Sequence, residues 1–225
     1  MRHGGRMMLR ALRGVHRWMA AAPGTYIWLA VMYATTFVYL RMPAESRTAF
    51  LRDRSTNIAH LHEEPLRVLA ASAFWAEGAH LVKFTVIFTV VFAVAERWMG
   101  TWRWLAVAVL GHVGATYASQ AVVLAGIEAG SLPHRLRHAV DVGPSYALMA
   151  VAGVLFHGIA GRWRWAYLAV LAVYVGAPAF AEHDFTAAGH VAAVLIGLSC
   201  AALVQGRPRW DPGASLPRRM RQVLP

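Results

Sequence analysis

The sequence predicts an all-α membrane protein with six transmembrane helices, and three observations support this fold class. Of the 225 residues, 58% are hydrophobic and only 15% are charged, against about 25% charged residues in an ordinary soluble domain. The apolar residues gather in blocks of roughly 16–25, long enough for helices that cross a hydrocarbon layer of about 30 Å. Segments such as 79–95 and 105–127 also lack the polar stripe of a soluble amphipathic helix.

The charge distribution predicts that both termini lie in the cytoplasm. The net charge is +11, with five arginines before the first apolar block and five after the last one. Flanking arginine follows the positive-inside rule, and nine of the 11 acidic residues fall in the loops that six spans place outside. No periodic basic helix with interleaved aromatic residues occurs between the tails, so we expect no nucleic-acid partner.

The apolar blocks divide the chain into a six-span core, residues 24–205, between two basic cytoplasmic tails, residues 1–23 and 206–225. The expected spans are 26–42, 79–96, 104–127, 145–160, 165–180 and 185–204. The first loop, 43–78, is unusually long for a compact membrane protein. It contains an apolar-aromatic stretch, 65–75, which we expect in the headgroup layer because Phe74 and Trp75 suit that depth.

The fourth span is expected to be short and partly submerged. Its apolar run from Ser145 covers about 16 residues, or about 24 Å at 1.5 Å per residue. Pro144 stands directly before it, as at the start of a helix. A helix that begins below the membrane surface leaves free backbone N–H groups inside the protein, and such a place is tolerated when it lines a cavity.

Polar residues within spans are the first candidates for function in a membrane protein. The predicted topology puts His80, Ser145 and His190 at similar depth in the outer half, with His112 and His157 toward the cytoplasmic half. A neutral histidine can take the proton of a serine nucleophile, and a second one can donate to the developing oxyanion. The alternative is structural, because serine packs in many spans and a span histidine is often simply hydrogen-bonded.

Four motifs in this order resemble the rhomboid family over about residues 24–205. His80 opens the second span, and Glu96 and Gly100 close it as a Glu-x-x-x-Gly pattern. Arg67 falls where rhomboids carry the Arg of a Trp-Arg motif in their first loop, with Leu66 in place of Trp. The other two motifs are the segment Gly143-Pro-Ser145, similar to the start of Gly-x-Ser-Gly, and the small-residue face of the sixth span around His190, formed by Gly189, Ala193 and Gly197.

The resemblance implies an intramembrane serine endopeptidase that cleaves single-span membrane proteins near the outer leaflet through a Ser-His dyad. Ser145 would be the nucleophile and His190 the base, with His80 in the oxyanion hole and Gly143 supporting it. Arg67, Glu96, Gly100, Gly189, Ala193 and Gly197 would be structural. No cofactor is implied. No metal is expected either, because His60 and His62 lie in a polar loop without the three or four convergent ligands that zinc needs.

Two departures from the family pattern keep a second hypothesis open. Phe84 stands where rhomboid proteases usually carry an oxyanion-binding Asn, and Tyr146 replaces the Gly after the serine, adding bulk where the backbone must approach closely. The alternative is an inactive rhomboid-like pseudoprotease that binds transmembrane segments; a transporter or scaffold is a more distant one. Residues 137–146 resemble an actinobacterial rhomboid-like branch, so we expect a bacterial plasma membrane.

Overall fold

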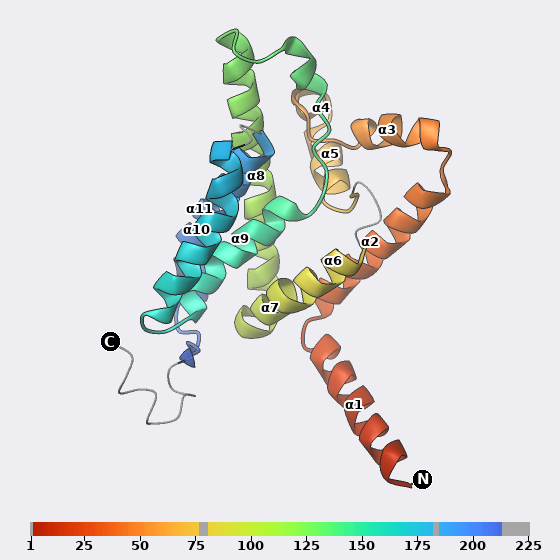
Figure 1. Cartoon of the computed structure of the whole chain (residues 1–225), viewed down its shortest axis with the longest axis vertical. Coiled ribbons are helices and arrows are strands. Elements are labelled where there is room, and N and C mark those ends of the chain that lie inside the picture. The colour runs from red at the N-terminus through yellow and green to blue at the C-terminus, as the bar shows by residue number, and fades with distance from the viewer. Residues whose placement is uncertain (1, 77–80, 182–184, 213–225) are drawn as a thin grey trace.

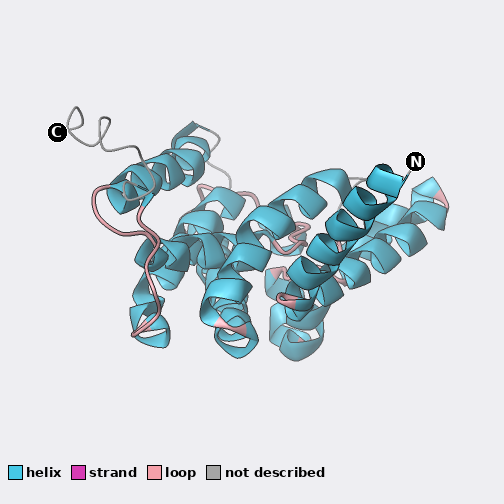
Figure 2. Cartoon of the chain, turned by 90° about the horizontal axis from the view of Figure 1, so that it is seen from below, coloured by secondary structure: helices cyan, strands magenta, loops and turns pink. Residues whose placement is uncertain are grey.

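The computed structural model describes residues 2–76, 81–181 and 185–212, and throughout these residues the chain consists of helices and loops without a β-strand (Figure 2). The predicted all-α class is therefore confirmed. The helices are α1 (Arg2–Ala20), α2 (Pro23–Arg41), α3 (Ala44–Asp53), α4 (Ile58–Glu63), α5 (Pro65–Ser72), α6 (Leu81–Ile87), the π-helix η1 (Phe88–Phe92), α7 (Ala93–Met99), α8 (Thr101–Glu128), the 3₁₀ helix η2 (His134–His138), α9 (Ser145–Leu155), η3 (Phe156–Gly158), α10 (Trp163–Ala181), α11 (Phe185–Ser199) and η4 (Cys200–Val204).

The described part of each expected span lies in a helix or in helices that follow one another without a break. The second expected span contains α6, η1 and α7 in succession, the fourth contains α9 with η3, and the sixth contains α11 with η4. Within the described residues, two helices, Thr101–Glu128 and Phe185–Val204, are individually long and apolar enough to cross a membrane, and Ser145–Gly158 is a shorter apolar helix. By length and composition, α8 and α11 are thus the described helices best suited to cross a membrane.

The segments that the charge pattern assigns to the cytoplasm gather at one end of the helices. The Arg97 guanidinium donates to the Trp18 carbonyl at 3.4 Å and lies over the Trp18 ring, 4.1 Å from its centroid. From the C-terminal side, Arg207 Nη2 donates to the Met99 carbonyl at 2.7 Å. The described parts of both tails therefore meet near the turn between α7 and α8.

The loops at the opposite end are also joined to each other. The Thr56 N–H and the Thr56 hydroxyl both donate to the Asp141 carbonyl at 3.1 Å, and the Asp141 N–H donates to Ser55 Oγ at 2.6 Å. Ser55 and Thr56 lie just before α4 in the long first loop, and Asp141 lies just before α9. This loop holds three helices, α3 to α5, and Figure 1 shows α4 and α5 beside α8.

The apolar face of α5 packs on protein. Val68 and Leu69 are buried and form a small cluster against Val113 of α8, whereas Leu66 on the other side is 83% exposed. The Trp28 indole of α2 donates to the Ala73 carbonyl at 3.1 Å just beyond α5. The stretch 65–75, expected in the headgroup layer, thus also bridges α2 and α8.

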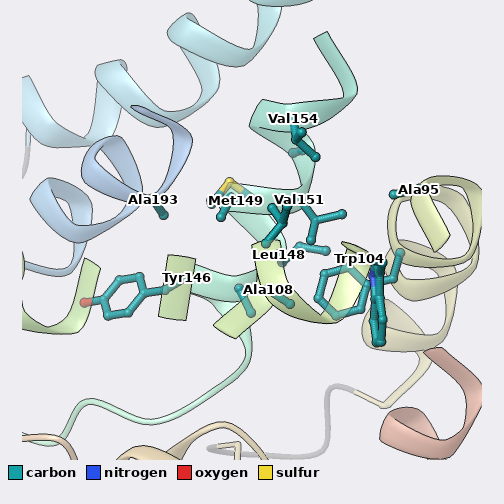
Figure 3. Packing of buried hydrophobic residues seen from close by; sticks show 14 of the residues in the cluster. Ala95, Trp104, Ala108, Tyr146, Leu148, Met149, Val151, Val154 and Ala193 are labelled. Atoms are coloured by element: carbon teal, nitrogen blue, oxygen red, sulfur yellow. The ribbon is translucent and has the colours of Figure 1, made fainter. Parts of the chain in front are cut away.

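Helix α9 forms the centre of the bundle, and every residue from 146 to 154 is buried. A helix that is apolar on all sides is expected in such a position. It packs against both α8 and α11, and Figure 3 shows its side chains between Ala108 of α8 and Ala193 of α11. The approach is close because glycines face it: a Cβ on Gly111 would overlap the Ala150 side chain, and one on Gly197 would overlap the Ala150 carbonyl.

A second cluster, of aromatic side chains, joins α2 and the second span to α8. Trp28 lies 5.9 Å from Trp104 between ring centroids, and Phe92 lies 5.2 Å from Trp104, both edge to face. Phe88 and Phe92 bound the π-helical segment and are completely buried. A π-bulge rotates the following turn of a helix relative to the preceding one, and here both of its terminal phenylalanines face this cluster.

We expect Gly197→Ala to destabilise the protein, because the added Cβ meets the backbone of α9 and not a flexible side chain. Overpacking of this kind costs about 1–3 kcal/mol or more. The measurement is the unfolding midpoint in detergent micelles. The matched control is Gly176→Ala in α10, where a Cβ meets nothing within 4 Å; its midpoint should stay unchanged or rise, since Ala favours a helix. Equal midpoints for the two variants would contradict the close packing of α9 and α11.

Candidate active site

Ser145 is the first residue of α9, and a tight turn positions it. Gly143 has φ +124°, a conformation that side-chain-bearing residues rarely adopt, and its N–H donates to the Ser72 carbonyl at 2.7 Å. Pro144 follows and begins the helix, with its carbonyl accepting from the Leu148 N–H at 2.9 Å. Because its N–H is bonded to Ser72, Gly143 anchors this turn to the first loop, and its backbone conformation shapes the turn before Ser145.

Ser145 and His190 line one cavity of about 340 Å³. His190 lies on α11 and, like Ser145, is half-buried. Among the described residues no hydrogen bond joins the serine hydroxyl to this histidine ring. Ser145 and His190, which the sequence predicts to act together, therefore share a cavity. Their hydrogen-bonded dyad stays a prediction. The remaining lining residues come from α6, α9, α10 and α11: Lys83, Phe84, Ile87, Leu148, Met149, Tyr174, Val175, Pro178, Thr186 and Ala187.

Tyr146, the residue after the serine, packs edge to face with the His190 ring. Its ring lies 5.4 Å from the imidazole between centroids at 69°, and its hydroxyl donates to Asp141 Oδ2 at 3.1 Å. The ring is buried because Gly189 leaves room for it: a Cβ there would lie 2.5 Å from Tyr146 Cε1. Tyr146 was expected to disturb the close approach of the helices. Its ring on α9 instead packs against a glycine on α11, so the helices still approach closely.

The start of α6 forms one wall of the cavity, the wall where the sequence predicts the oxyanion hole. Phe84 lines the cavity and packs edge to face on Phe88 with ring centroids 6.3 Å apart. Lys83 also lines the cavity, although its side chain is largely exposed. His80, expected in the oxyanion hole, lies outside the described residues. The described part of this wall thus offers an aromatic ring at the position where an amide was sought.

Glu96 and Gly100 form the junction of α2, α7 and α8. The buried Glu96 carboxylate accepts from the N–H groups of Gly24 (2.9 Å) and Thr25 (2.7 Å) and from the hydroxyls of Thr25 and Thr101, both at 2.7 Å. A carboxylate at this place caps the N-terminus of α2, where backbone N–H groups lack partners within the helix. Gly100, with φ +89°, makes the sharp turn into α8.

Gly189, Ala193 and Gly197 lie on the side of α11 that meets α9. Gly189 contacts Tyr146 and Gly197 contacts Ala150, both of α9, and Ala193 between them is completely buried. This face brings His190 alongside the first turns of α9. It is the geometric reason that the histidine and Ser145 reach the same cavity.

Arg67 belongs to the first loop and not to the cavity. Its guanidinium pairs with Glu64 and with Asp53, the latter at 2.6 Å. Hydrogen bonding to Glu64 and the nearby charge of Asp53 raise the pKa of Arg67 above its usual value. These exposed pairs connect α5 to α3, so the residue orders the loop from its outer surface, where ion pairs contribute little energy individually.

The buried polar pair of Asp141 and Gln120, next to the Tyr146 hydroxyl, was not singled out from the sequence. Asp141 Oδ2 accepts from Gln120 Nε2 at 3.5 Å as well as from Tyr146, and Asp141 is buried. About two turns closer to the N-terminus of α8, His112 Nε2 lies 3.0 Å from the Leu69 carbonyl and 3.1 Å from Ser72 Oγ. The available signal was the recurrence of polar residues every four positions in this span, at 112, 116 and 120.

The described residues thus form an all-helical bundle with two helices long and apolar enough to cross a membrane, and a cavity lined by Ser145 and His190 lies at the start of its central helix. A family model described as rhomboid-like protein matches residues 17–210. The chain therefore belongs to the rhomboid-like family of membrane proteins. Comparison with curated proteins and comparison with solved structures give no match.

We expect Glu96→Gln to lower stability, because an amide NH₂ would then face donors that now bond to a carboxylate oxygen. Leaving buried donors unsatisfied costs about 1–3 kcal/mol. The measurement is again the unfolding midpoint in detergent. Glu128→Gln at the exposed end of α8 removes the same charge and serves as the control. The capping role of Glu96 is wrong if the two variants unfold at the same temperature.

Proposed function

We propose that this protein is an intramembrane serine endopeptidase that cleaves single-span membrane proteins near the outer leaflet. The observation that supports it best is that Ser145 and His190, far apart in the sequence, line one cavity at the start of α9. Ser145 is the nucleophile and His190 the general base. No cofactor is required, since the reaction is a hydrolysis with water as the second substrate.

In this proposal the serine proton passes to His190 as Oγ attacks the peptide carbonyl carbon. The same proton then leaves with the amine of the cleaved bond, and water, activated by His190, hydrolyses the acyl-serine. The Ser145 N–H, at a helix N-terminus, donates to the oxyanion, with His80 as the expected side-chain donor. An edge-to-face contact with Tyr146, itself bonded to Asp141, holds the His190 ring.

The proposed setting is a bacterial plasma membrane crossed six times, with α2, α6–α7, α8, α9, α10 and α11 as the spans. The core is residues 24–205, and the tails 1–23 and 206–225 lie in the cytoplasm. Support comes from the clustering of Trp18, Arg97 and Arg207 at one end of the bundle and of Thr56 and Asp141 at the other. The fourth span, α9 with η3, is short and lies within the protein.

A catalytically inactive relative that binds transmembrane segments is the second candidate. The observation that favours it is Phe84, which lines the cavity where the family's proteases usually carry an amide donor. Losing one such donor costs about 10²–10³ in rate. The cavity is lined largely by apolar side chains, which suits a bound transmembrane segment with or without cleavage.

We expect the purified protein to react with a fluorophosphonate probe at Ser145. Labelling should vanish in Ser145→Ala and fall by about 10²-fold or more in His190→Ala, because the base supplies a contribution of that size. Ser131→Ala, in the exposed loop after α8, is the control and should label like wild type. Labelling is measured by in-gel fluorescence against time.

Absence of both labelling and cleavage across a panel of single-span substrates would overturn the protease proposal. Photo-crosslinking of those substrates to a probe beside the cavity then decides for the binding protein, provided that it is retained in Ser145→Ala.

We expect Phe84→Asn to increase the rate of labelling and cleavage by about tenfold or more, because it supplies a donor beside the oxyanion. Phe84→Leu is the control, since it removes the ring without adding a donor. If Asn and Leu change the rate equally, position 84 does not act on the oxyanion.

A further inference from the structure

The N-terminal helix α1 has two unlike faces. Met8, Leu12, Val15 and Met19 recur at steps of four, three and four residues, which places them on one side of a helix. Their side chains are exposed, from 43% at Met19 to 66% at Met8. A stripe of this kind in water is unusual and marks a surface that contacts something else.

Arginines occupy the opposite face. Arg10, Arg13 and Arg17 follow one another at steps of three and four, about half a turn away from the apolar stripe, and all are exposed. No acidic residue occurs anywhere in α1. A helix with an apolar stripe and an arginine face is the form that lies in the interface of a bilayer and pairs with anionic headgroups.

Of the side chains described in α1, from residue 7 onward, all but Trp18 are exposed. Figure 1 shows the helix projecting away from the other helices, and at its last turn Trp18 meets Arg97. Only Ala21 and Ala22 separate α1 from α2. Because α2 is the first proposed span, this short connection keeps α1 within reach of the membrane surface at all times.

We propose that α1 docks on the bilayer surface and binds anionic phospholipid, with the Met8–Leu12–Val15–Met19 stripe below the headgroups and Arg10, Arg13 and Arg17 at the phosphates. Charge complementarity and continuity with α2 favour lipid over a protein partner. A protein partner would have to compete with the bilayer surface, which is always present. The proposal does not depend on the chemistry of Ser145.

Spin labels on full-length protein, one copy per nanodisc, test it in a Cys200→Ala background. In discs with phosphatidylglycerol, a label at Leu12→Cys should be accessible to oxygen and shielded from a nickel chelate, about 5–10 Å below the phosphates. A label at Arg13→Cys should show the reverse. In purely phosphatidylcholine discs the shielding at Leu12 should decrease.

The arginine contribution is tested by replacing Arg10, Arg13 and Arg17 together with Gln. Each is expected to contribute about fivefold to docking, so the ratio of docked to free α1 should fall roughly a hundredfold. The control replaces Arg135, Arg137 and Arg209, which are exposed elsewhere, and should leave Leu12 shielded. Equal accessibility of the two labels in anionic discs overturns the proposal, as does shielding that appears only with two copies per disc, which would indicate self-association.

Discussion

The close approach of α8, α9 and α11 at Ala150 is the constraint on which the rest of the structure depends. Helices in a membrane gain no hydrophobic energy from leaving lipid for one another, so their association relies on close packing and hydrogen bonds. Gly111 on one side and Gly197 on the other let both neighbours approach the Ala150 turn. Where they meet, α9 is enclosed along nearly its whole length.

The candidate site follows from that enclosure. A helix surrounded by neighbours can begin below the level of its neighbours' ends, since the turn that precedes it is covered by protein. The turn at Gly143 is bonded to Ser72 of the first loop, and Asp141 is bonded to Ser55 and Thr56 of the same loop. The long loop after α2 therefore fixes the position of Ser145 from outside the bundle, while Gly189 and Gly197 fix His190 from within it.

Hydropathy was enough to locate α8 and α11, the two described helices long and apolar enough to cross a membrane, because an apolar block of the right length has few other stable states there. The order of the motifs was enough to bring Ser145 and His190 to one cavity. Contacts between distant polar residues were not accessible in this way: nothing in the sequence pairs Tyr146 with Asp141 and Gly189, or His112 with Ser72. Such pairings depend on the rotation of each helix about its axis, and a span that is apolar on all sides has no periodic signal for that rotation.

The two departures from the family pattern are therefore of different kinds. At position 146 the added ring occupies the space that Gly189 leaves, its hydroxyl donates to Asp141, and the ring contacts His190 edge to face. The glycine already present on α11 makes room for the bulk gained on α9, so this change is accommodated. At position 84 the ring packs on Phe88 and lines the cavity, which stabilises α6 but offers no hydrogen bond to an oxyanion. Whether the cavity can support catalysis therefore depends on Phe84, in the wall opposite the serine, and not on Tyr146 beside it.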